Sequence, residues 1–237
     1  MSKTTELAVA LDFDRVSEAE ALIEALSGLP VIFKVGLELY TVAGPEWVRS
    51  LTASGRRIFL DLKLHDIPNT VTKAVLQIEK MGVEFTTVHL VGGRKMLDQI
   101  QRELPVSSSL KVLGISVLTS FSEEEWVSNT EMMAQPGSAR GVHQSVMRFA
   151  ELANEHAVIS GMVCSPHEIP AIRKSHSGLF LMVPGIRPEG SEKNDQERVM
   201  TPAEASRAGA SAIVVGRPIT RSIDPRKTAE RILQELN

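Results

Sequence analysis

Two aspartates and a lysine lie close together in the first third of the chain, at the end of a segment typical of a buried strand. Residues 57–64 are mostly apolar and strand-prone, and Pro68 follows soon afterwards. Asp61 and Lys63 fall within this run, and Asp66 comes three residues after Lys63. Buried charges are costly unless they are paired, so such a cluster indicates an active site. A structural ion pair is the simpler alternative, but it leaves the third charge unexplained.

Side chains alternate between the two faces of a strand, and this alternation separates the charges from the leucines. One face, which we expect to pack against helices, carries Ile58, Leu60, Leu62 and Leu64. The opposite face carries Phe59, Asp61, Lys63 and His65. His65 lies beside the charges, but its position alone does not favour a direct role.

The first two strand-like runs each place a further charge on the same side of the sheet. Asp12 ends the run 7–12 and shares its face with two alanines. Lys34, in the second run, shares its face with Ile32 and Gly36. The first three strands therefore direct charges of both signs toward one end of the sheet. Such a network can satisfy its own charges, and packing alone does not explain it.

Two later runs end in a glycine that is followed closely by an arginine. Gly185 and Arg187 end the seventh run, and Gly216 and Arg217 end the eighth. Glycine lets the backbone approach a ligand, and arginine can hold phosphate with two hydrogen bonds. Loops after strands seven and eight of α/β barrels often bind phosphate, so the pair predicts a phosphate site. Gln196, in the loop between them, could close over the ligand.

Strand-like runs alternate with helix-prone stretches along the whole chain. This order predicts a (β/α)8 TIM barrel, formed by one domain over residues 1–237 without a linker. A doubly wound open sheet is the alternative, but the first turn is not rich in glycine. Clear helices are predicted at 18–26, 229–236 and 70–81, the last with a C-cap at Gly82. The predicted strands are 7–12, 31–37, 57–64, 85–91, 112–119, 158–165, 179–186 and 212–216.

Composition argues against several other classes of protein. The 237 residues carry a net charge of -3 and only 4% aromatic residues, so no basic or base-stacking surface for nucleic acid is expected. No apolar run approaches the ~20 residues of a membrane span, and no signal peptide is recognisable. The single cysteine, Cys164, excludes an internal disulfide, and we expect it to pack in the core of a cytoplasmic protein.

We expect no metal ion or cofactor. The six histidines lack the spacing of metal ligands, and Lys34 and Lys63 would repel a divalent cation at the charged end of the sheet. The chain contains no phosphate-binding loop or dinucleotide-binding fingerprint. His89, near the end of the fourth run, could line a cavity or only pack.

The segment D-L-K-L-H-D-I-P-N-T-V at 61–71 resembles the signature of the orotidine 5'-phosphate decarboxylase family in its bacterial form. The resemblance extends over essentially the whole chain, and the difference at Val183, where relatives often have threonine, is minor. The other matching motifs are A-L-D at 10–12, K-V-G at 34–36, V-L-T-S at 117–120, P-G-I-R-P at 184–188, D-Q-E-R-V-M-T-P at 195–202 and V-V-G-R-P-I-T at 214–220.

The resemblance implies a homodimeric enzyme that converts orotidine 5'-monophosphate to UMP and CO2 without metal or cofactor. Lys63 would stabilise and protonate a carbanion at C6, in a charged array with Lys34, Asp61 and the Asp66 of a second subunit. The implied substrate contacts are Asp12 and Lys34 at the ribose, Ile67 and Thr70 reaching the partner's site, Thr119 and Pro184 at the pyrimidine, and Arg187, Gln196, Gly216 and Arg217 at the phosphate.

Three other functions stay open. Sugar-phosphate decarboxylases or aldolases with the same D-x-K-x-x-D barrel use Mg2+ and an enediolate, and Glu38 could supply the acid that binds the metal. A phosphate-binding isomerase of tryptophan or histidine synthesis gives no reason for the Asp-Lys-Asp cluster. A non-catalytic nucleotide-binding protein could lose Asp61 or Lys63 without losing phosphate binding, yet both are present.

Overall fold

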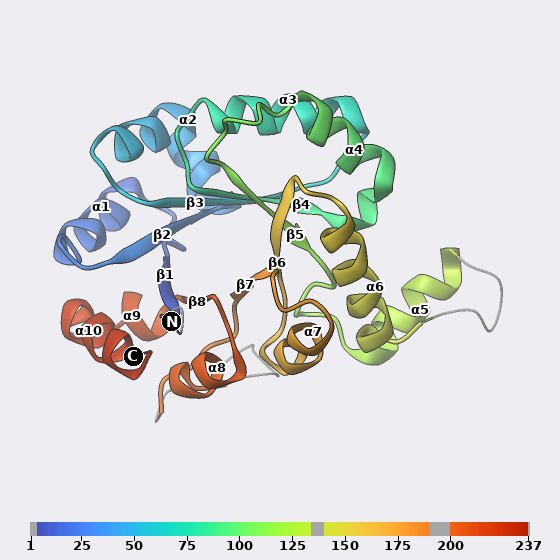
Figure 1. Ribbon diagram of the computed structural model, residues 1–237. Coiled ribbons are helices and arrows are strands. Elements are labelled where there is room, and N and C mark those ends of the chain that lie inside the picture. Colours follow the sequence, from blue (N-terminus) through green and yellow to red (C-terminus); the bar gives the residue numbers. More distant parts are fainter. Residues whose placement is uncertain (1–3, 134–139, 190–199, 237) are drawn as a thin grey trace.

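The computed structural model describes residues 4–133, 140–189 and 200–236, and there the strands form one closed parallel barrel (Figure 1). They follow one another around the barrel in sequence order, and β8 pairs with β1 to close it. The predicted (β/α)8 architecture is confirmed, and the open sheet is excluded. The strands are β1 (Glu6–Ala10), β2 (Val31–Gly36), β3 (Ile58–Leu64), β4 (Phe85–His89), β5 (Lys111–Ile115), β6 (Ile159–Val163), β7 (Phe180–Val183) and β8 (Ala212–Val215).

Each predicted run contains a strand, but the observed strands tend to end before the run does. The clearest case is the fifth, where the sequence predicts a strand over 112–119 and β5 ends at Ile115. Residues 117–119 leave the sheet and line a cavity at the end of the barrel. Burial in a cavity wall and burial in a strand both select apolar residues, so the sequence pattern does not distinguish them.

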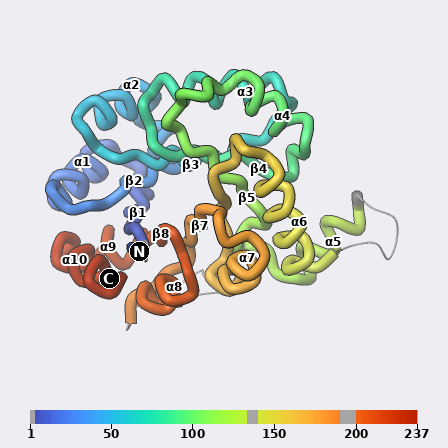
Figure 2. The backbone as a smooth tube through the Cα atoms, in the orientation of Figure 1, coloured from blue at the N-terminus to red at the C-terminus, as the bar shows by residue number. Residues whose placement is uncertain are grey.

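Helices cover the outside of the barrel, and two views show them as a ring around the sheet, with α5 projecting away from it (Figure 1 and Figure 2). None of the described helices is long and apolar enough to cross a membrane. The α-helices are α1 (Val16–Ala25), α2 (Leu37–Ala53), α3 (Pro68–Glu79), α4 (Gly93–Glu103), α5 (Glu123–Met133), α6 (Val142–Glu155), α7 (Ile169–Ser175), α8 (Pro202–Ala208), α9 (Arg217–Thr220) and α10 (Pro225–Glu235), with short 3-10 turns η1 (Leu90–Gly92) and η2 (Pro166–Glu168).

The bounds of α3 follow from its terminal residues. The helix begins at Pro68, where the missing N–H costs nothing because first-turn amides have no partner within the helix. It ends at Glu79 with Lys80 as the C-cap, so the predicted C-cap at Gly82 is wrong by two residues. Gly82 instead has φ 72°, in the turn that leads toward β4. This left-handed conformation favours glycine, which explains why the residue resembles a cap in the sequence.

Two apolar layers pack on either side of the sheet, as the alternation along β3 predicts. Ile58 and Leu60 are fully buried in the outer layer between the strands and the helices. Phe59 belongs to the smaller layer inside the barrel, where its ring meets that of Phe85 edge-on at 6.2 Å. Phe85 in turn lies 5.2 Å from the ring of Phe180 on β7. These three rings fill the middle of the barrel, so any cavity must lie at one of its ends.

A network of ion pairs joins the N-terminal ends of the strands. Arg57 donates from Nε to Glu84 Oε2 at 2.7 Å and from Nη2 to Glu6 Oε1 at 2.7 Å. Lys111 Nζ donates to Glu84 Oε1 at 3.0 Å and lies 4.7 Å from the centre of the Phe85 ring. The hydrogen bond to Glu84 is the main cause that raises the pKa of Arg57. Burial acts to raise the pKa of Glu84, but hydrogen bonds from Arg57 and Lys111 outweigh it and hold that pKa below its ordinary value.

We expect Glu84→Gln to lower the free energy of unfolding by about 1–3 kcal/mol at pH 7, because Arg57 and Lys111 lose a charged acceptor. The pKa of Glu84 is depressed in the folded protein, so its stabilisation is present above the unfolded-state value of 4.5 and is lost as the pH falls through the folded value. The difference from wild type should therefore shrink below about pH 4. Urea unfolding at several pH values measures this difference.

The matched control is Glu46→Gln, because Glu46 pairs with Arg49 at 3.4 Å on the surface and its side chain is 86% exposed. An exposed pair of this kind contributes about 0–1 kcal/mol. An equal loss in both variants at every pH would contradict a stabilising role for the network.

Candidate active site

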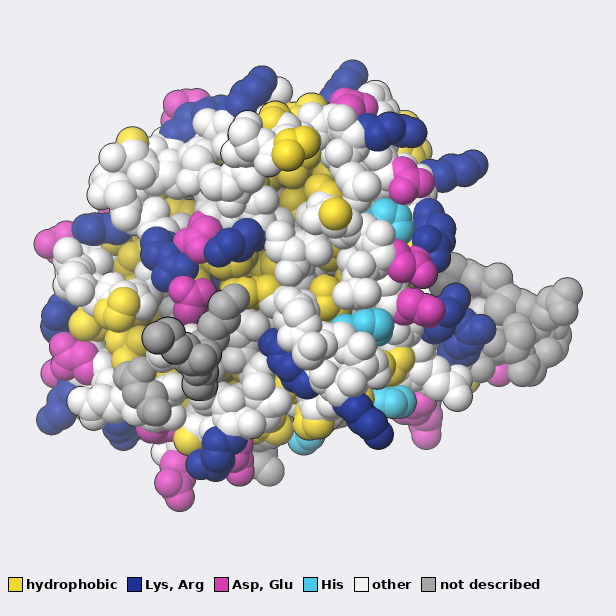
Figure 3. Space-filling view, in the orientation of Figure 1, with side chains coloured by type: hydrophobic (Ala, Val, Ile, Leu, Met, Phe, Trp, Pro, Cys, Tyr) yellow, Lys and Arg dark blue, Asp and Glu magenta, His cyan; other side chains and the backbone are white. Residues whose placement is uncertain are grey.

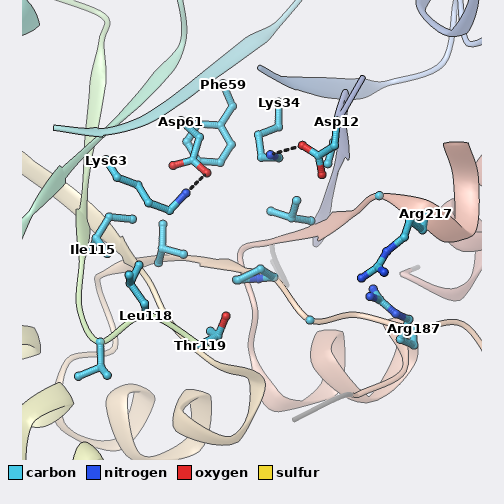
Figure 4. Close-up of a pocket in the computed structure, with 17 residues that line it drawn as sticks. Asp12, Lys34, Phe59, Asp61, Lys63, Ile115, Leu118, Thr119, Arg187 and Arg217 are labelled. Carbon is cyan, nitrogen blue, oxygen red and sulfur yellow. Dashed lines mark hydrogen bonds and ion pairs between the residues drawn. The ribbon is translucent and has the colours of Figure 1, made fainter. Parts of the chain in front are cut away.

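A cavity of about 270 Å³ opens at the C-terminal end of the barrel (Figure 4). Nine of the residues predicted for the site line it. They come from the ends of strands β1, β2, β3, β5, β7 and β8, which is where a parallel barrel brings separate parts of a chain together. The nine residues are Asp12, Lys34, Asp61, Lys63, Thr119, Pro184, Arg187, Gly216 and Arg217.

Asp12 and Lys34 form an ion pair across the ends of β1 and β2. Lys34 Nζ donates to Asp12 Oδ1 at 2.9 Å, and the side chains are 13% and 60% exposed. Two glycines leave space around this pair. A Cβ atom on Gly36 would lie 3.2 Å from Lys34 Nζ, and one on Gly216 would lie 3.6 Å from Asp12 Oδ2. Larger residues at these positions would take up room beside the pair.

Asp61 and Lys63 form a second ion pair on β3. Lys63 Nζ donates to Asp61 Oδ2 at 2.7 Å, and Figure 4 shows the ammonium reaching back toward the carboxylate. The side chain of Asp61 is only 10% exposed, whereas that of Lys63 is 34% exposed. The carboxylate is thus nearly withdrawn from water, and the ammonium end remains accessible from the cavity.

The backbone of β3 is irregular at Lys63. Its φ is 49°, and it is the only residue other than glycine with a positive φ in the described parts of the chain. The pairing of β3 with β4 shifts register between Leu60 and Leu64. The Lys63 N–H donates to Thr87 Oγ1 at 2.8 Å, and the same oxygen donates to Asp61 Oδ1 at 2.9 Å.

This irregularity corrects the expected position of His65. Strict alternation places His65 on the face of Lys63, but its side chain is exposed and does not line the cavity. The ring lies 5.6 Å from that of His89 at the end of β4. Burial is the main cause that lowers the pKa of His89, and the electrostatic interactions with His65 and Lys63 act in the same direction. The sequence left open whether His89 lines a cavity or only packs. It does not line the cavity, so it packs.

Arg187 and Arg217 converge at the opposite side of the cavity (Figure 4). Arg187 is only 8% exposed, and its Nε has no hydrogen-bond partner among the described residues. Burial and the nearby charge of Arg217 both lower the pKa of Arg187. Two guanidinium groups close together repel each other unless an anion lies between or beside them. The arrangement is therefore suited to hold a phosphate group.

Three of the predicted residues that the structure describes do not lie at this cavity. Asp66, Ile67 and Thr70 are exposed, and the Asp66 carboxylate accepts a hydrogen bond from the Ile67 N–H at 2.6 Å. None of these three lines the cavity of its own chain. Gln196 lies outside the described residues. Glu38, the acid available to a metal-dependent alternative, is exposed and also lies away from the cavity lining.

The sequence reasoning missed two kinds of residue in and around the site. One is the apolar wall, which includes Phe59, Ile115, Leu118 and Val163. The other is Thr87, which is fully buried beneath the Asp61–Lys63 pair. A threonine on the inner face of a buried parallel strand is a polar exception, and the same alternation that found Asp61 could have found it.

Cys164 lies in the core, as the sequence predicts. Cys164 is buried, and burial raises the pKa of its thiol far above the ordinary range, which fits packing rather than a nucleophile. Within residues 4–133, 140–189 and 200–236, no three His, Cys, Asp or Glu side chains are grouped so that they could hold a metal ion.

Comparisons with known proteins place the chain in a family. Residues 5–232 match the model of the "Orotidine 5'-phosphate decarboxylase / HUMPS family". A Moorella thermoacetica protein named orotidine 5'-phosphate decarboxylase is 42% identical over 248 aligned residues, covering 100% of this chain and 94% of the relative. A protein of the same name from Geobacter sulfurreducens is 42% identical over 232 residues, covering 96% and 94%.

Solved structures agree with these sequence matches. The orotidine 5'-phosphate decarboxylase of Lactobacillus acidophilus superposes with a TM-score of 0.84 at 34% identity, covering 98% of this chain and 99% of the other. The enzyme from Pyrococcus horikoshii OT3 gives a TM-score of 0.74 at 25% identity, covering 97% and 98%. Since both the family model and relatives above 40% identity extend over nearly the whole chain, the chain belongs to the orotidine 5'-phosphate decarboxylase / HUMPS family.

Proposed function

We propose that this chain removes CO2 from orotidine 5'-monophosphate and releases UMP, as its relatives' names indicate. One observation carries the proposal beyond the family name. A single cavity holds two Asp–Lys ion pairs on one side and two converging arginines on the other. A nucleotide has a phosphate at one end and a base at the other, so it can meet both groups at once.

The arginine side of the cavity suits the phosphate of the substrate. Arg187 is nearly buried and already desolvated, so an anion beside it replaces repulsion with attraction. Gly216 and Arg217 stand at the start of α9, and Gly185 has φ 79°, so the backbone can approach the phosphate closely. Gln196 is proposed as a further phosphate contact. Binding energy from this end, remote from the reacting carbon, can be used to position the other end.

The ribose and the pyrimidine would lie between the arginines and Lys63. The Asp12–Lys34 pair offers an acceptor and donors to ribose hydroxyls. Thr119 and Pro184 line the cavity on the side of β5 and β7, where we place the pyrimidine. The apolar wall formed by Phe59, Ile115 and Val163 limits the water around that ring. A cavity with little water strengthens each charge interaction at the reacting carbon.

Lys63 is assigned the central catalytic role. When the bond between C6 and the carboxyl carbon breaks, CO2 leaves and the electron pair stays on C6. The Lys63 ammonium stabilises this negative charge and then transfers a proton to C6, after which its amine takes a proton from water. Asp61 holds the ammonium at 2.7 Å, and we place the departing carboxylate beside it. Its repulsion of that carboxylate could add to the rate, although positioning of Lys63 is sufficient to explain its presence.

A second subunit is proposed to complete the site. Asp66, Ile67 and Thr70 are exposed and do not line the cavity of their own chain, so they are available to a neighbouring one. Ile67 is 66% exposed, and further exposed apolar side chains, Leu37, Val42 and Val91, follow the ends of β2 and β4. Apolar exposure around these strand ends supports an interface there. In a two-fold dimer the same surface serves both copies, so each Asp66 can join the partner's charged array.

No metal or organic cofactor is part of this proposal. The two lysines of the cavity already supply positive charge where a carbanion forms, and they would repel a divalent cation. A metal-dependent sugar-phosphate reaction needs carboxylates in the cavity that can bind the metal. Asp12 and Asp61 are both paired, and Glu38 lies outside the lining. The lone buried cysteine is compatible with the reducing cytoplasm, which we propose as the location.

We expect wild-type protein in EDTA to convert orotidine 5'-monophosphate to UMP, followed by absorbance, and Lys63→Ala to lower kcat by about 10³-fold or more. The loss has two physical causes, since the variant removes both the charge that stabilises C6 and the proton donor. UMP binding, measured by calorimetry, should persist because the arginines remain. Lys174→Ala changes an exposed lysine on α7 and is the control for a lost surface charge.

The proposal would be refuted if the wild type converted its substrate only after Mg2+ was added, or if it turned over a sugar phosphate instead. Either result would favour the function of the metal-dependent relatives. UMP binding without any turnover would favour a non-catalytic nucleotide-binding protein.

Arg217→Ala should raise KM for orotidine 5'-monophosphate by about 10- to 100-fold, because hydrogen bonds to a charged group contribute about 1.5–3 kcal/mol. The nucleoside orotidine lacks the phosphate, so its slow turnover should be nearly the same in the variant and the wild type. Arg221→Ala, at an exposed arginine one turn further along, is the matched control. If the variant weakened nucleotide and nucleoside turnover equally, Arg217 would not be the phosphate contact.

Mixing two inactive variants tests the shared site. Lys63→Ala and Asp66→Ala subunits should each be inactive alone, yet a hybrid dimer contains one site with both residues intact. Equal mixing after mild dissociation should restore about a quarter of wild-type activity, since about half of the dimers are hybrids with one good site each. Sedimentation confirms that dimers are present. If no activity returned, Asp66 would act within its own subunit or not at all.

A further inference from the structure

Thr87 contacts both Asp61 and the backbone of Lys63, although it does not line the cavity. Its side chain is fully buried on the inner side of β4. The hydroxyl oxygen accepts a hydrogen bond from the Lys63 N–H at 2.8 Å and donates its own proton to Asp61 Oδ1 at 2.9 Å. A hydroxyl has one proton to donate and two lone pairs to accept with, so it can do both at once.

The backbone at Lys63 needs an external partner of this kind. With φ at 49°, Lys63 adopts a conformation that side chains with a Cβ rarely take. The register shift between Leu60 and Leu64 interrupts the ladder with β4, so the Lys63 N–H cannot rely on a regular strand partner. The Thr87 hydroxyl supplies that partner. Unusual backbone conformations persist only when the surroundings hold them, and they concentrate at functional sites.

The hydrogen bonds form a closed ring through residue 63. From the Lys63 N–H the ring passes to Thr87 Oγ1, then to Asp61 Oδ1, across the carboxylate to Oδ2, and back to Lys63 Nζ at 2.7 Å. The main chain and the ammonium of the same lysine are therefore tied to one carboxylate. If the backbone of Lys63 moved, the distance between its ammonium and the reacting carbon would change as well.

We propose that Thr87 is a positioning residue that sets where the Lys63 ammonium stands. The inference rests on the proposed role of Lys63 in decarboxylation. Thr87 does not touch substrate; it acts through the Lys63 backbone and through the Asp61 carboxylate. Its loss should therefore slow the chemical step while the phosphate and ribose contacts, which lie on other strands, keep their affinity.

The neighbouring Thr86 provides a matched control. It is also fully buried on β4, and its hydroxyl donates to the backbone oxygen of Leu60 at 3.0 Å. It points to the other face of the strand, and among the described residues its hydroxyl is not hydrogen-bonded to Asp61 or Lys63. A threonine-to-valine change at either position removes a buried hydroxyl at nearly constant volume. A difference in kcat between the two variants therefore reflects the contacts of Thr87 with Asp61 and Lys63, and not the loss of a buried hydroxyl from β4.

We expect Thr87→Val to lower kcat for orotidine 5'-monophosphate by about 10- to 100-fold, because small misplacements of a catalytic group cost rates of this order. KM and the dissociation constant of UMP should stay within about threefold of wild type, since the lost interaction belongs to the chemical step. Thr86→Val should keep kcat within about threefold while showing a similar fall in Tm. Thr87→Ser retains the hydroxyl and should recover most of the kcat that Thr87→Ala loses. The comparison of these two variants tests the positioning role even if Thr87→Val does not fold.

Amide hydrogen exchange gives a readout that does not depend on turnover. The Lys63 N–H should exchange slowly in wild type and Thr87→Ser, and at least about tenfold faster in Thr87→Val. Equal kcat in Thr87→Val and Thr86→Val, or no rescue by serine, would overturn the positioning role even if the wild type decarboxylates its substrate normally. A wild type without decarboxylase activity would instead refute the proposed function, and the exchange data would then report only the structural tie.

Discussion

The carboxylate of Asp61 is the group on which the rest of the site depends. It is almost fully buried, and it accepts hydrogen bonds from the Lys63 ammonium at 2.7 Å and the Thr87 hydroxyl at 2.9 Å. A buried carboxylate is stable only if it is satisfied, and a lysine in an apolar barrel is stable only if it is paired. Each group therefore makes the other possible. The closed barrel adds the remaining parts by bringing six other strand ends to the same place.

Charged side chains are arranged differently at the two ends of the barrel. At the N-terminal end, Arg57, Glu84, Glu6 and Lys111 are joined in one network. At the C-terminal end the ion pairs face a cavity, and the two arginines face each other. Phe59, Phe85 and Phe180 lie between the ends, so apolar packing separates the ion-pair network from the charges that face the cavity. On the outer surface, acidic and basic side chains are interspersed on the face that Figure 3 shows, which fits the absence of a basic footprint in the sequence.

Strand alternation predicted much of this from the sequence, because it depends only on local geometry. Asp12, Lys34, Asp61 and Lys63 point into the barrel end as expected, and the arginines follow the predicted strands. Alternation failed at His65, where the backbone turns at Lys63 to a positive φ that no residue type signals. Alternation could have placed Thr87 on the inner face of β4, but its contacts with Asp61 and Lys63 depend on the register between β3 and β4, which a single strand does not reveal. Asp66, Ile67 and Thr70 follow the end of β3, where strand alternation no longer applies.

The proposed phosphate site between Arg187 and Arg217 would also couple ligand binding to the stability of the folded protein. Without an anion, Arg187 is buried beside a like charge and the folded state bears that repulsion. A phosphate bound there, as proposed, would offset it, and a ligand that binds only the folded state adds about 2.7 kcal/mol of stability at a concentration one hundred times its Kd. Resistance of the protein to heat and to proteolysis should therefore rise and fall with the nucleotide pool around it.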